Sequence, residues 1–315
     1  MTSVSLGITL WNQAATWAEF EAAARRVDEL GYEHLWTWDH LYAIVGDPYQ
    51  PVFEGYAALG ALAKATSRTR LGLFVGANTF RNPGLVAKSL TTLDHASGGR
   101  IIAGLGAAWH ELEHEAYGID YGSSVGERLD WLDEAVAAVR ALFAGESVTS
   151  PPGGRYAFRD LRLLPAPVQR PIPIMIGGSG EKKTLRIVAR YADQWNTGGP
   201  PERLAHKLVV LRDHCAAVGR DPSAIELTVG CKPLIRDSRA EAMRAWRELM
   251  AHNRTSDELE DDEPDWIGTP EDVAAAMRSR IELGFATFMA ELPAPYDEET
   301  MARWIGEVKP MVERG

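Results

Sequence analysis

The sequence has little cysteine and no long apolar run. Cys215 and Cys231 are its two cysteines among 315 residues, and they form no C-x-x-C pair. A disulfide framework is therefore excluded, and a reducing compartment fits. The N-terminal segment has neither a basic region nor a following apolar stretch, so we expect no signal peptide and a cytoplasmic protein. No apolar run approaches the length of a membrane span.

Positive charge is also scarce. Lys and Arg number 33 against 44 Asp and Glu, which gives a formal net charge of −11. A negatively charged chain is repelled by phosphate backbones, so nucleic acid is not the expected partner. The hydrophobic content of 45% is ordinary for a globular protein. We expect a small-molecule substrate and no membrane partner, and the sequence leaves a homodimer possible.

Strand-like apolar runs alternate with helix-like stretches along the whole chain. The runs are apolar on both faces, as in strands buried in a parallel sheet. They are residues 4–10, 32–36, 70–75, 101–105, 172–176, 193–196, 225–230 and 285–290. This alternation predicts an α/β fold, a (β/α)8 TIM barrel formed by residues 1–315 as a single domain, although a doubly wound sheet would alternate similarly.

Two segments interrupt the alternation. Residues 146–170, after the fourth strand, are rich in proline and glycine and predict an irregular insertion. Residues 252–266, after the seventh strand, contain the acidic run DELEDDE at 257–263. A run of like charges predicts a solvated, mobile loop.

A glycine-rich turn follows the fifth strand. Residues 177–180 read GGSG, and a helical pattern starts at Glu181. Backbone N–H groups at such a helix start form an anion site, and Lys182 and Lys183 would lie in the first turn. P-loop and dinucleotide fingerprints both fail, because lysine stands where each requires a glycine. The turn therefore either binds another anion or is a tight turn with surface lysines.

Barrel chemistry lies at the carboxyl ends of the strands. That rule selects Trp11 and Asn12, Asp39 and His40, the segments 76–83 and 104–114, the glycine turn, and residues 195–199. Aromatic groups are frequent there and carboxylates are few. This composition predicts a flat, apolar ligand with a polar handle.

His110, Glu111 and His114 spell the H-E-x-x-H signature of zinc peptidases. The motif directly follows a buried strand, and no obvious third ligand accompanies it. Glu113 and Glu115 are also charged where a buried zinc helix would be apolar. We therefore expect no metal site and keep a zinc peptidase only as a minor alternative.

Four segments resemble the luciferase-like monooxygenase superfamily. They are DELGYEHLWTWDH at 28–40, FRNPGLVAKSLTTLDHASGGRIIAGLGAAWHELEHEAYG at 80–118, PIMIGGSGEKKTLRIVARYADQWN at 173–196 and WIGTPEDVAAAMRSRIELGF at 266–285. They occur in the family's order and extend over nearly the whole chain. The likeness is greatest to the oxidoreductase branch that uses the deazaflavin coenzyme F420.

The resemblance implies a barrel with the deazaflavin ring at its carboxyl-terminal mouth. It places the cofactor phosphate on Gly177, Gly178, Ser179 and Gly180 and a cis peptide at or next to Phe74–Val75. The cofactor contacts that it implies beyond the turn are Asp39, Phe74, Val75, Asn78, Gly106, His110, Ile176 and Lys182. For Asn78 and for Arg81 a structural role is equally open, and Trp109 and Trp195 are expected in the wall and core.

Asp39 and His40 match the family's Asp–His pair near the reactive face of the cofactor. The implied reaction moves hydride between C5 of the deazaflavin and a carbon or imine of the substrate. His40 is suited to carry the accompanying proton near neutral pH, with Asp39 orienting it. Some sugar-phosphate dehydrogenases of this branch have a catalytic Glu where this chain has Ala107, which argues against a dehydrogenation assisted by that acid.

Two alternatives on the same fold stay open. One is an FMN-dependent monooxygenase that receives reduced flavin from a separate reductase. The other is a non-catalytic flavin-binding barrel, which an intact Asp39–His40 pair disfavours.

Overall fold

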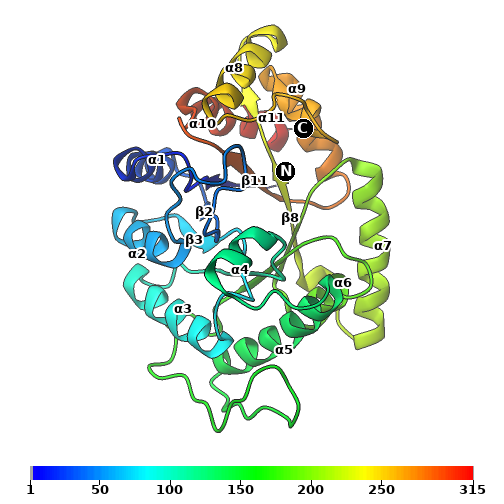
Figure 1. The fold of residues 1–315 in the computed structure, drawn as a ribbon. Helices are drawn as coiled ribbons and strands as arrows, with labels where there is room; N and C mark the ends of the chain where they lie inside the picture. Colours follow the sequence, from blue (N-terminus) through cyan, green and yellow to red (C-terminus); the bar gives the residue numbers. More distant parts are fainter. Residues whose placement is uncertain (1–2, 315) are drawn as a thin grey trace.

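The computed structural model describes residues 3–314 and forms a nearly closed parallel barrel with helices around it (Figure 1). The hydrogen-bonded strand order is β3 (Arg70–Leu73), β2 (His34–Thr37), β1 (Ser5–Leu10), β11 (Thr287–Leu292), β8 (Glu226–Cys231), β7 (Gln194–Thr197), β6 (Ile174–Gly177), β5 (Ala103–Gly106) and β4 (Gly76–Ala77). A parallel bridge between Leu71 of β3 and Ile101, just before β5, brings the two sides of the sheet together. The predicted TIM barrel is confirmed, whereas the single-domain assignment to 1–315 stays a prediction, with residues 1, 2 and 315 outside the described range.

Apolar side chains fill the barrel in two layers. The outer layer lies between the strands and the surrounding helices, and the inner cluster contains Trp36, Ile102, Met175 and Met289. A side chain at Gly72 would meet the Trp36 ring, since its Cβ would lie 2.2 Å from Cζ3. A glycine in β3 therefore makes room for the large indole inside the barrel.

The helices that surround the barrel are α1 (Trp17–Leu30), α2 (Gly55–Ala65), α3 (Pro83–Ser97), α5 (Val125–Phe143), α6 (Thr184–Tyr191), α7 (Pro201–Val218) and α9 (Pro270–Ile281), followed by α10 (Glu298–Arg303) and α11 (Lys309–Glu313). Thr16 and Thr269 cap α1 and α9 in reciprocal capping boxes. Within residues 3–314 none of the helices combines the length and the apolarity needed to cross a bilayer.

The helix after the glycine turn begins later than predicted. It starts at Thr184, and Glu181, Lys182 and Lys183 form a turn before it. Two ion pairs hold this turn, from the Glu181 carboxylate to Lys207 and from the Lys183 amine to Asp130. The two lysines are therefore not in the first helical turn, and the amine of Lys183 is engaged elsewhere.

The two insertions lie where the sequence predicts them. Residues 146–170 form an irregular loop beside α3 and α5, with one antiparallel bridge between Val148 and Leu161 (Figure 1). Between β8 and α9 lie β9 (Leu234–Ile235), α8 (Arg239–His252), the short helix η2 (Glu263–Trp266) and β10 (Ile267–Gly268). The short helix α4 (Glu111–Tyr117) lies in front of the barrel in this view.

The acidic run is not the purely solvated loop that the sequence predicts. Arg280, which is 1% exposed, lies 2.9 Å from Asp262 and 3.2 Å from Asp265. Lys232 pairs with Glu263 at 2.6 Å, and Arg203 pairs with Asp261. A buried guanidinium requires carboxylate partners, so the run is tied to the barrel rim.

Candidate active site

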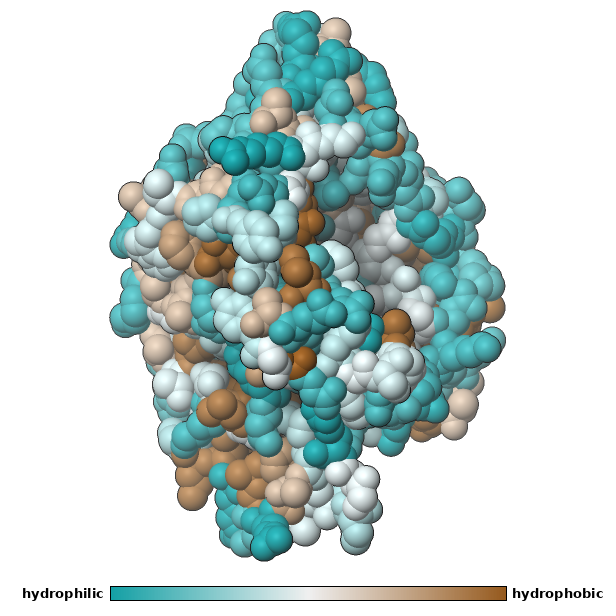
Figure 2. Space-filling view, viewed as in Figure 1, coloured by the Kyte–Doolittle hydropathy of each residue, from teal (hydrophilic) through white to brown (hydrophobic). Residues whose placement is uncertain are grey.

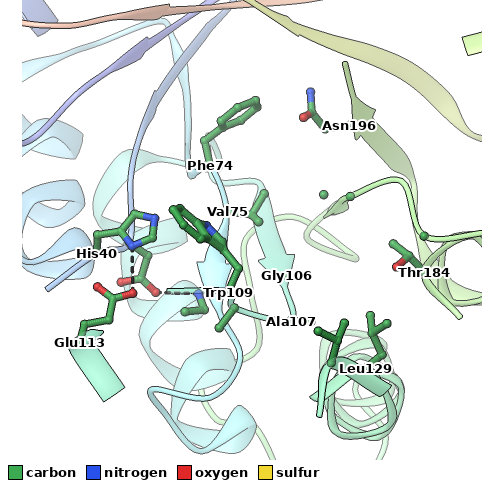
Figure 3. A pocket seen from close by; sticks show the side chains of 17 residues that line it. His40, Phe74, Val75, Gly106, Ala107, Trp109, Glu113, Leu129, Thr184 and Asn196 are labelled. Atoms are coloured by element: carbon green, nitrogen blue, oxygen red, sulfur yellow. Dashed lines mark hydrogen bonds and ion pairs between the residues drawn. The ribbon is translucent and has the colours of Figure 1, made fainter. Parts of the chain in front are cut away.

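A cavity of about 420 Å³ opens at the carboxyl ends of the strands. Eight of the predicted site residues line it: Asp39, His40, Phe74, Val75, Gly106, Gly177, Gly178 and Gly180. Figure 3 shows His40 and Glu113 on one side, with Leu129 and Thr184 across from them. The space-filling view shows this end of the barrel hollowed to the right of its centre (Figure 2).

Val75 forms an apolar ridge in the cavity. The Phe74–Val75 peptide is cis, as predicted. A Cβ on Gly106 would lie 2.6 Å from one Val75 methyl group, and a Cβ on Gly177 would lie 3.0 Å from the other. The two glycines therefore leave the space that the Val75 side chain occupies, and the resulting surface can support a flat ring.

Glu113 orients His40. Its Oε1 lies 3.0 Å from His40 Nδ1 (Figure 3), and its Oε2 accepts the Leu41 N–H at 2.8 Å. Burial alone would raise the pKa of Glu113, but the hydrogen bond and charge of His40, together with the Leu41 N–H, lower it overall. An ionised carboxylate only accepts, so Nδ1 carries the hydrogen and Nε2 is left as the acceptor. The sequence pattern did not identify Glu113 as a site residue, although it stands three residues after His110 in a segment that lies at the barrel mouth.

Asp39 does not orient His40, which corrects the sequence prediction. Its carboxylate accepts from Arg81 at 2.7 and 2.9 Å and from the Ala77 N–H at 2.8 Å. Burial raises the pKa of Asp39, and the Arg81 guanidinium opposes that rise. Arg81 also pairs with Glu54. Asp39 and Arg81 therefore hold β4 against the end of β2. Of the two roles left open for Arg81, the structure supports the structural one.

The glycine turn presents two backbone donors that are free within the described part of the chain. Gly178 has φ +122°, and its N–H donates to the Asn196 carbonyl at 3.0 Å. The Ser179 and Gly180 N–H groups find no acceptor among residues 3–314. An adjoining cavity of about 490 Å³ brings Arg203 and Lys207 of α7 to the side of Gly178 and Ser179. The sequence alone does not single out either cation, because a surface helix carries many such residues.

Four predicted contacts have other surroundings. Asn78 donates to the Tyr156 hydroxyl at 3.0 Å, and Lys182 is exposed and lines neither of these cavities. Ile176 packs in the outer core because the pleat of β6 turns its neighbour Met175 inward instead. His110 begins α4 outside the cavity lining, and its buried Nε2 has no partner in the described part of the chain.

The H-E-x-x-H motif joins α4 to the barrel. His114 is fully buried, with Nδ1 2.7 Å from the His110 carbonyl and Nε2 2.7 Å from the Thr79 hydroxyl. Both ring nitrogens are therefore occupied by protein groups. Among the residues that the structure describes, no three His, Cys, Asp or Glu side chains are grouped to hold a metal ion.

Comparison with known proteins gives consistent similarities. The family described as luciferase-like monooxygenase matches residues 3–291. An uncharacterized protein of Mycobacterium tuberculosis is 31% identical over 245 residues, which is 72% of this chain and 83% of that protein. The F420-dependent glucose-6-phosphate dehydrogenase of Microbacterium testaceum is 31% identical over 70% of this chain and 66% of its own length.

Among solved structures, an F420-dependent secondary alcohol dehydrogenase in complex with an F420-acetone adduct superposes with a TM-score of 0.83. The match covers 98% of this chain and 99% of that chain at 20% identity. At this identity the likeness supports the fold alone.

Proposed function

The chain belongs to the luciferase-like monooxygenase family, and from that premise we propose that it transfers hydride between coenzyme F420 and a small organic substrate. The observation that carries the proposal is that one cavity holds the His40–Glu113 pair, the Val75 ridge and part of the glycine turn. A proton-transfer group, a support for a flat ring and an anion-binding end are the three parts that a deazaflavin oxidoreductase requires. Relatives of 27–31% identity that are named as F420-dependent dehydrogenases support the choice of cofactor.

Each part has a separate task in this proposal. When bound, the deazaflavin supplies the hydride donor or acceptor. Val75 supports the flat ring, and the Ser179 and Gly180 N–H groups bind the phosphate. His40 Nε2 takes or returns the proton that accompanies hydride transfer, and the exposed Trp109 lines the open side of the cavity.

A titration with two cofactors tests the proposal. Purified protein is titrated with F420 and, separately, with FMN while fluorescence is followed. We expect stoichiometric binding of F420. The dissociation constant for FMN should be higher by a factor of at least about ten. Tight FMN binding without F420 binding would favour the monooxygenase instead. Failure of both cofactors to bind would reject both activities.

A further inference from the structure

A second cavity of about 520 Å³ lies beside the first and shares the Trp109 side chain with it. Four tryptophans line it: Trp11, Trp38, Trp109 and Trp246. The Trp11 and Trp38 rings lie 4.4 Å apart, centroid to centroid. His40 stands edge-on to Trp38 at 6.2 Å and to Trp109 at 5.7 Å. The proposed proton carrier is therefore in direct contact with two walls of this second cavity.

The charges around the second cavity are mostly negative. Glu258, Glu260, Glu263 and Glu291 line it together with a single cation, Lys232. Lys232 lies 2.6 Å from Glu263, which neutralises that carboxylate. No ion pair within the described residues engages the side chains of the other three. The cavity therefore joins aromatic faces to the Glu258 and Glu260 carboxylates, which have no fixed counter-charge within the described residues, and to Glu291, whose pKa burial raises and the Lys232 charge lowers.

Two indole N–H groups show how the aromatic walls are arranged. Trp246 Nε1 donates to the Asp257 carbonyl at 3.0 Å, which fastens its ring to the acidic loop. Trp11 is 3% exposed, and its N–H has no hydrogen bond of proper geometry in the part of the chain that the structure covers. A buried donor without an acceptor is unusual, because its desolvation is uncompensated. The Trp11 and Trp38 N–H groups nevertheless act on the Glu291 carboxylate, because both lower its pKa against the effect of burial.

We propose that the second cavity is the substrate subsite and that it selects an organic cation, such as an ammonium group on an apolar body. Indole faces attract cations through their quadrupole, and desolvation strengthens that attraction. The Glu258 and Glu260 carboxylates add a Coulombic preference of the same sign and disfavour a phosphorylated or carboxylated substrate. Its role as a substrate subsite rests on the proposed function, whereas its selectivity in binding does not.

Positively charged side chains lie on the other side of Glu291. That residue also lines the cavity that contains Arg203, Lys207 and Ser179, where we place the cofactor phosphate. Lys207 and Arg203 keep their own acidic partners, Glu181 and Asp261. The N–H groups of Ser179 and Gly180, which are free within residues 3–314, and not these paired cations, therefore make that end suited to an anion, so a cationic substrate would not compete for the phosphate site.

Calorimetric titration with three probes of one size tests the inference. The probes are benzylammonium, the neutral benzyl alcohol and the anionic benzoate, each added to the full-length protein without cofactor. We expect the cation to bind at least about tenfold more tightly than either of the others. Glu291→Gln and the exposed double variant Glu258→Gln/Glu260→Gln should each weaken cation binding by about tenfold. Glu282→Gln, an exposed change of the same charge on the far end of α9, should leave it unchanged.

Equal affinities for the three probes would overturn the inference. So would equal effects of the cavity variants and Glu282→Gln. The double variant lies on exposed residues, so it decides the question even if Glu291→Gln does not fold. A parallel titration with F420 separates the two proposals: cation selectivity without F420 binding rejects the hydride-transfer function and the substrate role, and F420 binding without selectivity rejects the cation site alone.

Discussion

At the scale of the residue, one hydrogen bond decides which nitrogen of His40 can act. Glu113 is 1% exposed, and its carboxylate accepts from both the His40 ring and the Leu41 N–H. This arrangement places the hydrogen on Nδ1 and leaves Nε2 free to accept a proton. Glu113 is therefore a positioning residue, and His40 is the group that we expect to exchange the proton.

Replacing Glu113 by glutamine should reverse the tautomer of His40. The carboxamide oxygen would keep the Leu41 N–H, and its NH₂ group would donate to Nδ1, which moves the ring hydrogen to Nε2. Nitrogen-15 shifts of the His40 ring report this change directly. Turnover of any substrate should fall by about 10² or more in Glu113→Gln and in His40→Ala, with little change in F420 affinity.

Glu111→Gln is the matched control, because Glu111 is an exposed residue at the start of the same helix. It should change neither the ring shifts nor turnover. Unaltered turnover in His40→Ala, under conditions where chemistry limits the rate, would remove His40 from the catalytic groups.

His34 should make the stability of the fold depend on pH. It is 4% exposed, and burial lowers its pKa from 6.5 to about 4, with Arg70 adding to the effect. The unfolded chain therefore binds a proton below pH 6.5 that the folded chain does not bind until about pH 4. The free energy of unfolding is therefore highest above pH 6.5, where His34 is neutral in both states. It falls by up to about 3 kcal/mol as the pH decreases to 4, because only the unfolded chain binds the proton.

Urea unfolding at neutral pH and near pH 4.5 measures this loss. His34→Gln should lose less stability between the two conditions than the wild type, because the glutamine does not titrate. His252→Gln, which removes an exposed histidine of α8, should behave as the wild type does. Equal losses in the wild type and His34→Gln would show that His34 does not resist protonation in the fold.

At the scale of the element, the turn between β6 and α6 is where we propose that the cofactor phosphate binds. Gly178 has φ +122°, a conformation that side chains rarely adopt, and its carbonyl accepts the Trp195 indole N–H at 2.8 Å. This conformation leaves the Ser179 and Gly180 N–H groups without protein acceptors among residues 3–314. The anion site thus depends on one backbone conformation rather than on a lysine side chain.

Gly178→Val should weaken F420 binding at least about tenfold while the barrel stays folded. A cofactor fragment without the phosphate should bind the variant as well as it binds the wild type. Gly153→Val is the matched control: Gly153 has φ +83° and open space around its Cβ position, in the insertion at 146–170. Normal binding of whole F420 to Gly178→Val would mean that the turn has no role in the site.

At the scale of the whole molecule, the cavities and the cations and acids of the mouth all lie at one end of the barrel. A ligand that binds there contacts several strands at once, so it should stabilise the entire fold. At about 100 times its dissociation constant, F420 should add about 2.7 kcal/mol to the free energy of unfolding and raise the melting temperature by roughly 5 °C.

EDTA should leave the melting temperature and F420 binding unchanged, because both His114 nitrogens are bonded to protein atoms. Elemental analysis of the same sample should show no stoichiometric zinc. Stoichiometric zinc, together with a lower melting temperature after chelation, would contradict this account of the H-E-x-x-H motif.

The sequence by itself determined the barrel and the end of it that carries the chemistry. Burial of a strand requires only a local apolar run, and the carboxyl ends of parallel strands converge whatever their detailed packing. Residues as far apart as His40, Val75, Gly106 and Gly178 could therefore be assigned to one site. The family resemblance predicted the cis peptide at Phe74–Val75 and the family, and both predictions are confirmed.

Only the tertiary structure decided which side chains meet. Glu113 contacts His40 across 73 positions of the chain, and Asp39 turns to Arg81 instead. Ile176 faces the outer core because the phase of a pleat depends on the register of the whole sheet. A sequence pattern reports which face of a local element is buried, whereas the energy of a side-chain pair depends on the relative placement of two elements within a few ångströms. That placement is set by the packing of the complete barrel.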